Sequence, residues 1–249
     1  MGADYHQFCA IARALELVGE RWTLLLVREL LLRGPLPAAA IARGLPDVPP
    51  NQLAERLIDL EAAGLVVAGD GPPNGALHRA YSLTATGRQL EGIVDALAEF
   101  GLTCLDWPRS PAEVVLPHVL MRQLELRYDR ERARHRRFSG RFALVLEDAD
   151  ALWSVEPGRT APRYWAVQAD AHGLRIRPGA CPEPDATLHM TVATCTALVA
   201  REPDAVLPLR VDGDRARALG LLSLLQRRRS CPADPPPALD TNPARAAAG

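Results

Sequence analysis

The side chains with the clearest chemistry lie at the start of residues 48–65, VPPNQLAERLIDLEAAGL. This segment has apolar residues at helical spacing, Leu53, Leu57 and Leu60. Its other side begins with two amides, an acid and a base, Asn51, Gln52, Glu55 and Arg56. Amide side chains can pair with adenine in a DNA major groove, and a guanidinium can pair with guanine or phosphate. The alternative is an ordinary amphipathic surface helix, and this segment alone favours that alternative.

The elements before this segment favour the DNA-reading interpretation. Residues 5–18 and 21–33 predict two helices, the second apolar nearly all round and therefore buried. Gly34-Pro35 ends the second helix. A short Ala-rich helix over 37–43 and a turn over 44–49 then lead into the central helix, which is a helix-turn-helix order.

A β-hairpin is predicted directly after the central helix. Residues 66–68 read as a strand, 69–75 as a Gly- and Pro-rich tip, and 78–83 as the returning strand. In such a wing, His78 or Arg79 could reach phosphate or the minor groove. Thr84 is then expected to cap a long helix over 86–105.

Three ordered segments of residues 5–107 resemble the HxlR-type winged-helix transcriptional regulators, which are relatives of MarR: CAIARALELVGERWTLLLVREL, GLPDVPPNQLAERLIDLEAAGLV and RAYSLTATGRQLEGIVDALAEFG. The resemblance implies a homodimer formed by the first helix and the long helix after the wing. Its two recognition helices would enter successive major grooves of a double-stranded operator about 34 Å apart. By matching position, Asn51, Gln52, Glu55 and Arg56 would face DNA, and Arg79 would lie on the wing. Pro49 stands where the family often has a Ser, so a side-chain helix cap is lost.

Charge and composition qualify this interpretation. The chain has 249 residues, 48% of them hydrophobic and 24% charged, which is typical of globular proteins. The net charge is −1, and residues 1–110 hold nine Arg against thirteen Asp and Glu, so any basic surface must be local. Five cysteines without metal-type spacing, and no signal peptide or long apolar run, favour a reduced cytoplasmic protein that is not bound to a membrane.

Cys9 is a possible redox sensor, because some relatives in the resembling family use a Cys at this place for that purpose. A reactive thiol needs a nearby cation or helix N-terminus to lower its pKa, and His6 is the nearest candidate. The apolar neighbours Phe8, Ala10 and Ile11 favour the alternative, a structural Cys that faces the dimer core.

The second half of the chain has a different sequence pattern, with more predicted strands. Residues 107–111 predict a boundary, residues 112–130 a helix, and residues 130–137, with five Arg, a solvated helix end or a phosphate-binding patch. Strands are expected over 142–146, 151–155, 163–167, 174–177, 185–192 and 209–211, with helices over 194–201, near 203–207 and over 214–225. The fold class is therefore α+β, with an antiparallel sheet in the second half. We expect domains at 1–110 and 111–226 and a disordered tail at 227–249.

The segments PDATLHMTVATCTALVARE and LRVDGDRARALGLLSLL resemble the sterol-carrier-protein fold. The resemblance covers residues 112–226, although the Gly common before the final strand is absent here. It implies an apolar cavity between sheet and helices for a hydrophobic small molecule. The large apolar residues expected near it are Phe142, Trp153, Trp165, Met190, Leu221 and Leu224. Plain core packing is the alternative for each.

No catalytic, metal or cofactor motif is visible, and His172, His189 and Cys195 are too scattered to form one. The sequence therefore predicts a non-enzymatic regulator, more often a repressor, that binds DNA and senses a hydrophobic effector. The alternative is a lipid or metabolite carrier whose helical N-terminal half only dimerises, which the acidic first half keeps open.

Overall fold

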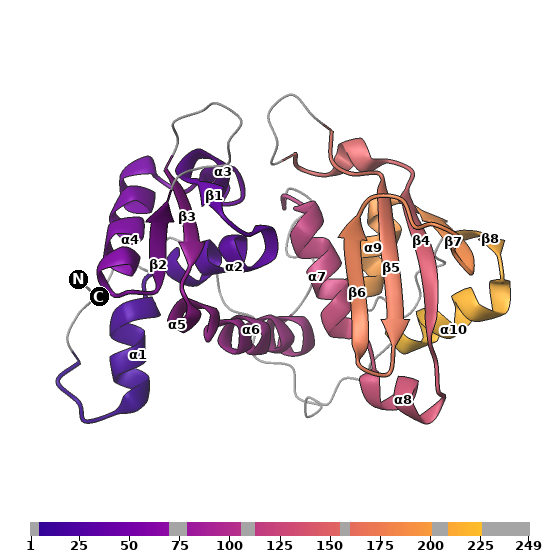
Figure 1. Ribbon diagram of the computed structural model, residues 1–249, viewed down its shortest axis with the longest axis horizontal. Helices are drawn as coiled ribbons and strands as arrows, with labels where there is room; N and C mark the ends of the chain where they lie inside the picture. Colours follow the sequence, from indigo (N-terminus) through magenta and orange to yellow (C-terminus); the bar gives the residue numbers. More distant parts are fainter. Residues whose placement is uncertain (1–4, 70–78, 106–112, 155–159, 201–208, 226–249) are drawn as a thin grey trace, which may run out of the picture.

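The computed structural model describes residues 5–69, 79–105, 113–154, 160–200 and 209–225. They form two halves side by side, a helical half with a small sheet and a half built on a larger sheet (Figure 1). Each half has its own hydrophobic core cluster. The predicted α+β class is confirmed. The predicted boundary at 107–111, the helical piece near 203–207 and the tail at 227–249 lie wholly or mainly outside the described residues.

The first half follows the predicted helix-turn-helix and wing order. Its elements are α1 (Ala10–Val18), α2 (Thr23–Arg33), β1 (Leu36–Pro37), α3 (Ala38–Arg43), α4 (Pro50–Ala62), β2 (Val66–Gly69), β3 (Ala80–Leu83), α5 (Ala85–Arg88) and α6 (Glu91–Cys104). The wing strands β2 and β3 pair antiparallel, and β1, which the sequence did not predict, pairs with the other edge of β3. Its Leu36 contributes to the core below the wing.

Local sequence features set where the recognition helix α4 begins and ends. Pro50 occupies the first turn of α4, where its missing N–H removes no helical hydrogen bond. Gly64 adopts a φ of 69°, and the Leu65 N–H then donates to the Leu60 carbonyl at 2.9 Å. This left-handed residue stops the helix and turns the chain into β2.

The long helix expected over 86–105 is two helices, α5 and α6, with the break at Gln89 and Leu90. Thr84 caps α5 as predicted, because its hydroxyl accepts from the Gly87 N–H at 3.0 Å. A Cβ atom on Gly87 would lie 2.0 Å from the Leu65 carbonyl oxygen. This close approach holds α5 against the start of β2, and α6 then leaves in its own direction.

The second half is a five-stranded sheet with helices. Its elements are α7 (Pro117–Arg127), α8 (Arg130–His135), β4 (Gly140–Leu146), a 3-10 turn (Ala149–Ala151), β5 (Tyr164–Asp170), β6 (Gly173–Pro178), β7 (Ala186–Met190), α9 (Val192–Ala200), β8 (Leu209–Gly213) and α10 (Arg215–Leu225). The strand predicted over 151–155 is wrong for its described part, because the Asp148–Ala151 segment closes a tight turn instead.

The sheet is mixed, which corrects the prediction of an antiparallel sheet. The strand order is β6-β5-β4-β7-β8, and β4 and β7 run parallel, with Leu144 opposite Leu188. The other neighbouring strands pair antiparallel. The hairpin of β5 and β6 pairs with one edge of β4, and β7 pairs with the other edge in the same direction as β4.

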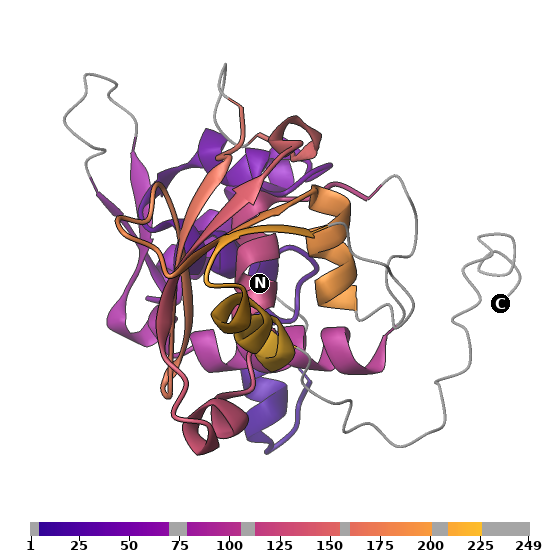
Figure 2. The ribbon, with the colours of Figure 1, turned by 90° about the vertical axis from the view of Figure 1, so that its right-hand side faces the viewer.

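One face of this sheet is apolar and covered, and the other is polar. Phe142, Leu144, Trp165, Val167 and Ile176 share the covered face, as their register shows. Figure 2 shows α9 and α10 on the same side of the strands, and both contribute side chains to the same core. A sheet with one face in the core and one in solvent is consistent with the alternating burial of β5.

The two halves meet at α6 and α7. Leu102 of α6 is buried in the core of the second half. The buried Arg127 of α7 donates to the Leu102 carbonyl at 2.7 Å and to the Val199 carbonyl at 2.8 Å. Within the part of the chain that the structure describes, no helix is long and apolar enough to cross a membrane.

Candidate nucleic-acid interface

The helix α4 divides its residues between the core and the surface as predicted. Its apolar stripe, Leu53, Leu57 and Leu60, is buried. Asn51, Gln52 and Glu55 are exposed on the other side. Neither acidic residues in the first turn nor a side-chain cap from Pro49 occupy the helix N-terminus. The backbone N–H groups and amide side chains at this end are therefore open to an external acceptor such as phosphate or a base edge.

Arg56 is arranged differently from its neighbours. Its side chain is only 12% exposed, and its Nη2 atom lies 3.1 Å from a Glu55 carboxylate oxygen and 3.0 Å from one of Asp59. The guanidinium that was predicted to read guanine or phosphate is thus ion-paired along its own helix. In this conformation the structure does not bring Arg56 together with Asn51 and Gln52.

On the wing, Arg79 is fixed to α4. Its guanidinium contacts both carboxylate oxygens of Glu61, at 2.6 and 2.8 Å, and lies 5.8 Å from the ring centroid of Tyr81. These contacts tie the base of the wing to the recognition helix. His78 and the wing tip lie outside the described residues.

Cys9 immediately precedes α1 and is partly buried. Phe8 and Ile11 beside it are among the most exposed apolar residues of the chain, at 113% and 71%. The thiol therefore lies next to an uncovered apolar surface, and the sensor and structural interpretations of Cys9 both remain predictions.

The six residues predicted to surround a ligand are mostly core residues. Phe142, Met190, Leu221 and Leu224 are buried in the core between sheet and helices. Trp153 is 46% exposed, and its indole N–H donates to the Arg43 carbonyl of the first half at 3.1 Å. Of the six, Trp165 alone lines the cavity of about 530 Å³ that lies between the two halves.

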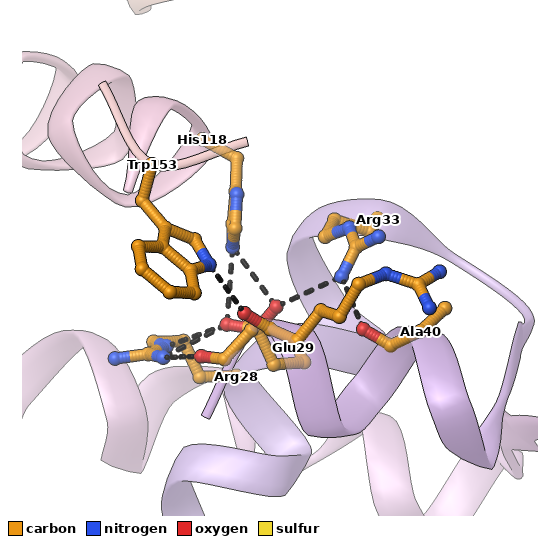
Figure 3. A network of polar contacts seen from close by, with 8 residues as sticks. Arg28, Glu29, Arg33, Ala40, His118 and Trp153 are labelled. Atoms are coloured by element: carbon orange, nitrogen blue, oxygen red, sulfur yellow. Dashed lines mark hydrogen bonds and ion pairs between the residues drawn. The ribbon is translucent and has the colours of Figure 1, made fainter. Parts of the chain in front are cut away.

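Sequence reasoning missed a buried polar network around Glu29 of α2 (Figure 3). The Glu29 side chain is fully buried and contacts Arg28 at 2.8 Å, Arg33 at 3.2 Å and Nε2 of His118, on α7, at 3.0 Å. Burial opposes ionisation of Glu29, but the hydrogen bond and charge of His118, together with Arg28, outweigh it and lower the Glu29 pKa. A single acid next to Arg28 in a mainly apolar helix was the available signal.

Gly44 completes this network from the turn before α4. A Cβ atom there would lie 1.9 Å from Oε2 of Glu29, and the Gly44 carbonyl accepts from Arg28 at 3.1 Å. The polar network thus fixes α2 to the helix-turn-helix turn and to α7. Among the described residues, no group of three or more His, Cys, Asp or Glu side chains is arranged to hold a metal ion.

An α3–turn–α4 unit followed by the β2–β3 hairpin defines a winged helix-turn-helix protein. A family model described as HxlR-like helix-turn-helix matches residues 17–107. The chain belongs to this family of HTH-type transcriptional regulators.

Two curated relatives illustrate the match. An HTH-type transcriptional regulator of Mycobacterium tuberculosis is 37% identical over 102 residues, which are 41% of this chain and 63% of that protein. The regulator YvaP of Bacillus subtilis is 32% identical over 94 residues, which are 38% of this chain and 85% of YvaP. The chain therefore spans less than two thirds of the mycobacterial relative.

Solved structures are similar over a comparable share of the chain. A MarR-family transcriptional regulator of Porphyromonas gingivalis W83 is 25% identical, covers 42% of this chain and 99% of its own, and has a TM-score of 0.37. The reduced form of YodB from Bacillus subtilis is 27% identical, covers 38% and 92%, and has a TM-score of 0.33.

Proposed function

We propose that this chain is a ligand-responsive transcriptional regulator that binds a double-stranded DNA operator as a homodimer. Residues 1–110 bind DNA and dimerise, and residues 111–226 contribute the response to a hydrophobic small molecule. Repression is the expected sign, since a winged helix on a promoter blocks polymerase without further contacts.

The observation that carries the proposal is the exposure of Asn51 and Gln52 at the open N-terminus of α4, in a family of helix-turn-helix regulators. Recognition helices of this motif contact base edges through their N-terminal residues. Amide pairs suit adenine, while the backbone N–H groups of the first turn suit phosphate. Glu55, one turn further, is exposed, and a carboxylate at this position would accept from the amino group of cytosine.

An uncovered apolar surface supports the dimer. It consists of large side chains on α1 and α6 or beside α1, each 42% exposed or more: Tyr5, Phe8, Ile11, Leu15, Leu17, Ile93, Leu97 and Phe100. Large apolar side chains exposed in such number are typical of a surface that a partner covers. The same two helices form the interface that the family resemblance implies.

The test is a fluorescence anisotropy titration with a labelled fragment from directly upstream of the coding sequence and an unrelated fragment of equal length. We expect the upstream fragment to bind more tightly than the unrelated one. Gln52→Ala should weaken binding of the upstream fragment by about 1–3 kcal/mol. Gln168→Ala, which truncates an exposed Gln on β5 in the other half, is the matched control and should leave binding unchanged. Equal binding of both fragments, or no loss in Gln52→Ala, contradicts the proposal. A chain that binds apolar small molecules but no DNA would instead be a carrier.

A further inference from the structure

The cavity between the two halves is built from elements far apart in the sequence. Its walls are α2 and α6 of the winged helix and α7 and β6 of the second half. Representative apolar lining residues are Leu32, Val94, Ala98, Met121, Trp165 and Ile176. We call this space the interdomain cavity. At about 530 Å³ it falls within the range of sites that hold a small organic ligand.

The charged groups around the interdomain cavity are balanced. Its lining contains three arginines, Arg28, Arg122 and Arg177, and three acids, Glu91, Asp95 and Glu125. It also contains His118, which is paired with the buried Glu29 at 3.0 Å. These groups already have partners of their own. Arg122 contacts Asp95 and lies 3.0 Å from Glu125, Arg28 lies 2.8 Å from Glu29, and Arg177 lies 3.5 Å from Glu125.

This pairing of the lining charges favours an uncharged ligand. An ionised ligand would have to displace an existing ion pair, which leaves a partly buried charge without its partner. A neutral ligand gains apolar contact and disturbs none of the pairs. The lining therefore fits a neutral, largely apolar molecule better than an anion or a cation.

The helix α6 connects the interdomain cavity to the proposed dimer surface. Val94, Ala98 and Gly101 lie on its cavity side at spacings of four and three. Ile93 and Phe100 are 43% and 56% exposed on the adjoining side. An occupant of the cavity thus touches α2, which is packed in the helix-turn-helix core, and a helix whose adjoining side is the proposed dimer contact, with Leu97 common to both sides.

We propose that the interdomain cavity is a binding site for a neutral, largely apolar small molecule, and that its occupancy sets the placement of α6 against α2. The inference rests on the proposed regulatory function for the meaning of the response, but not for the binding itself. It places the effector at the junction of the halves, outside the packed core between the large sheet and its helices. A ligand that favours one spacing of the halves shifts the population of dimers able to bind DNA.

The experiment compares two dyes that differ in one charged group. N-phenyl-1-naphthylamine is neutral, and 8-anilinonaphthalene-1-sulfonate is the same framework with a sulfonate. We expect saturable binding of the neutral dye to the full chain, and binding of the sulfonate weaker by about tenfold, which corresponds to ~1.4 kcal/mol. Equal or tighter binding of the sulfonate contradicts the ligand class.

Two glycines of α6 give a matched pair of variants. A Cβ atom at Gly101 or at Gly92 meets no heavy atom within 4 Å, so both positions accept a side chain, and only Gly101 lines the interdomain cavity. Gly101→Phe should lower the affinity for the neutral dye by about tenfold or more, while Gly92→Phe should bind the dye with wild-type affinity. If Gly101→Phe loses its cooperative thermal unfolding, Ala98→Phe against Ala96→Phe makes the same comparison. Equal dye affinity within each pair overturns the site.

Operator binding, measured in parallel, separates the two proposals. The neutral dye should change the affinity of the wild type and of Gly92→Phe for the upstream fragment, and leave Gly101→Phe unaffected. A cavity that binds dye in a chain that binds no DNA sustains the site and contradicts the proposed function. DNA binding that responds to the dye equally in all three proteins overturns the site and leaves the proposed function standing.

Discussion

Nε2 of His118 lies 3.0 Å from both carboxylate oxygens of Glu29, so α7 of the second half contacts a carboxylate that is buried in the winged helix. Glu29 has no exposed side-chain surface, while Arg28 and Arg33, which also contact it, are 20% and 14% exposed. The carboxylate is therefore stabilised by groups from both halves. This contact makes the placement of α7 against α2 a part of the stability of the DNA-binding half.

Removing the Glu29 carboxylate should destabilise the folded chain. Glu29→Ala leaves Arg28, Arg33 and His118 without their shared acceptor, and we expect it to lower the free energy of unfolding by ~3 kcal/mol. Urea denaturation at pH 7, followed by circular dichroism, measures the change. The exposed Glu20→Ala serves as control and should shift stability by less than about 0.5 kcal/mol. A Glu29→Ala midpoint equal to that of the control would show that the network contributes little.

The same network predicts how stability depends on pH. His118 and Arg28 outweigh burial and lower the Glu29 pKa. A lowered folded-state pKa gives a stabilisation that is fully present above the unfolded value, about 4.3, and is lost as the pH falls through the folded value. The stability difference between the wild type and Glu29→Gln should therefore shrink as urea titrations move from pH 7 to pH 3. A difference that is constant over this interval would mean that folding does not lower the Glu29 pKa, and one that grows as the pH falls would mean that folding raises it.

Much of the first half was predictable because its signals are local. The stripe of Leu53, Leu57 and Leu60, the cap at Thr84 and the stop at Gly64 each act within a few residues, and all appear in the structure. The break between α5 and α6 was missed. Gly87, just before it, approaches the Leu65 carbonyl, and no local pattern records such a contact between segments distant in sequence.

The second half shows the same limit more strongly. The alternation along β4 predicts a strand but contains no information on its neighbour, so the parallel pairing with β7 was not expected. The hydrogen bond from the indole N–H of Trp153 to the Arg43 carbonyl of the other half was not predictable either, since no pattern within the second half records it. The interdomain cavity is likewise a property of how two units meet, which no periodicity within either unit records.

A charge on the uncovered apolar surface should separate the dimer. Phe100→Glu would place a carboxylate in the proposed interface without a partner there, and we expect a shift from dimer to monomer at micromolar concentration. Sedimentation velocity gives the mass. Leu219→Glu changes an equally exposed residue of α10, 53% against 56%, and should leave the dimer intact. A wild-type chain that is monomeric, or a dimer unaffected by Phe100→Glu, contradicts this interface.

Cys195 should be chemically inert in the folded protein. Burial, with a further contribution from the Asp148 charge, raises the pKa of its thiol to about 12, so almost no thiolate exists near neutral pH. In a titration with 5,5′-dithiobis(2-nitrobenzoic acid), Cys195→Ser should show the same number of fast thiols as the wild type when folded and one fewer in urea. Cys181→Ser, which removes a partly exposed thiol, should lose a fast one. Loss of a fast thiol in Cys195→Ser would mean that α9 opens readily.

Arg56 offers the sharpest test of how the recognition helix reads DNA. Its guanidinium is paired with Glu55 and Asp59 and its side chain is 12% exposed, whereas Gln52 is free to approach a base edge. We therefore expect Arg56→Ala to change operator affinity by less than about 0.5 kcal/mol, against a loss of about 1–3 kcal/mol in Gln52→Ala. Anisotropy titrations of both variants at the same series of salt concentrations make the comparison, because phosphate contacts weaken as salt rises. An equal loss in Arg56→Ala would require the guanidinium to leave its ion pairs on binding. A smaller dependence of affinity on salt in that variant would then identify phosphate, not a base, as its contact.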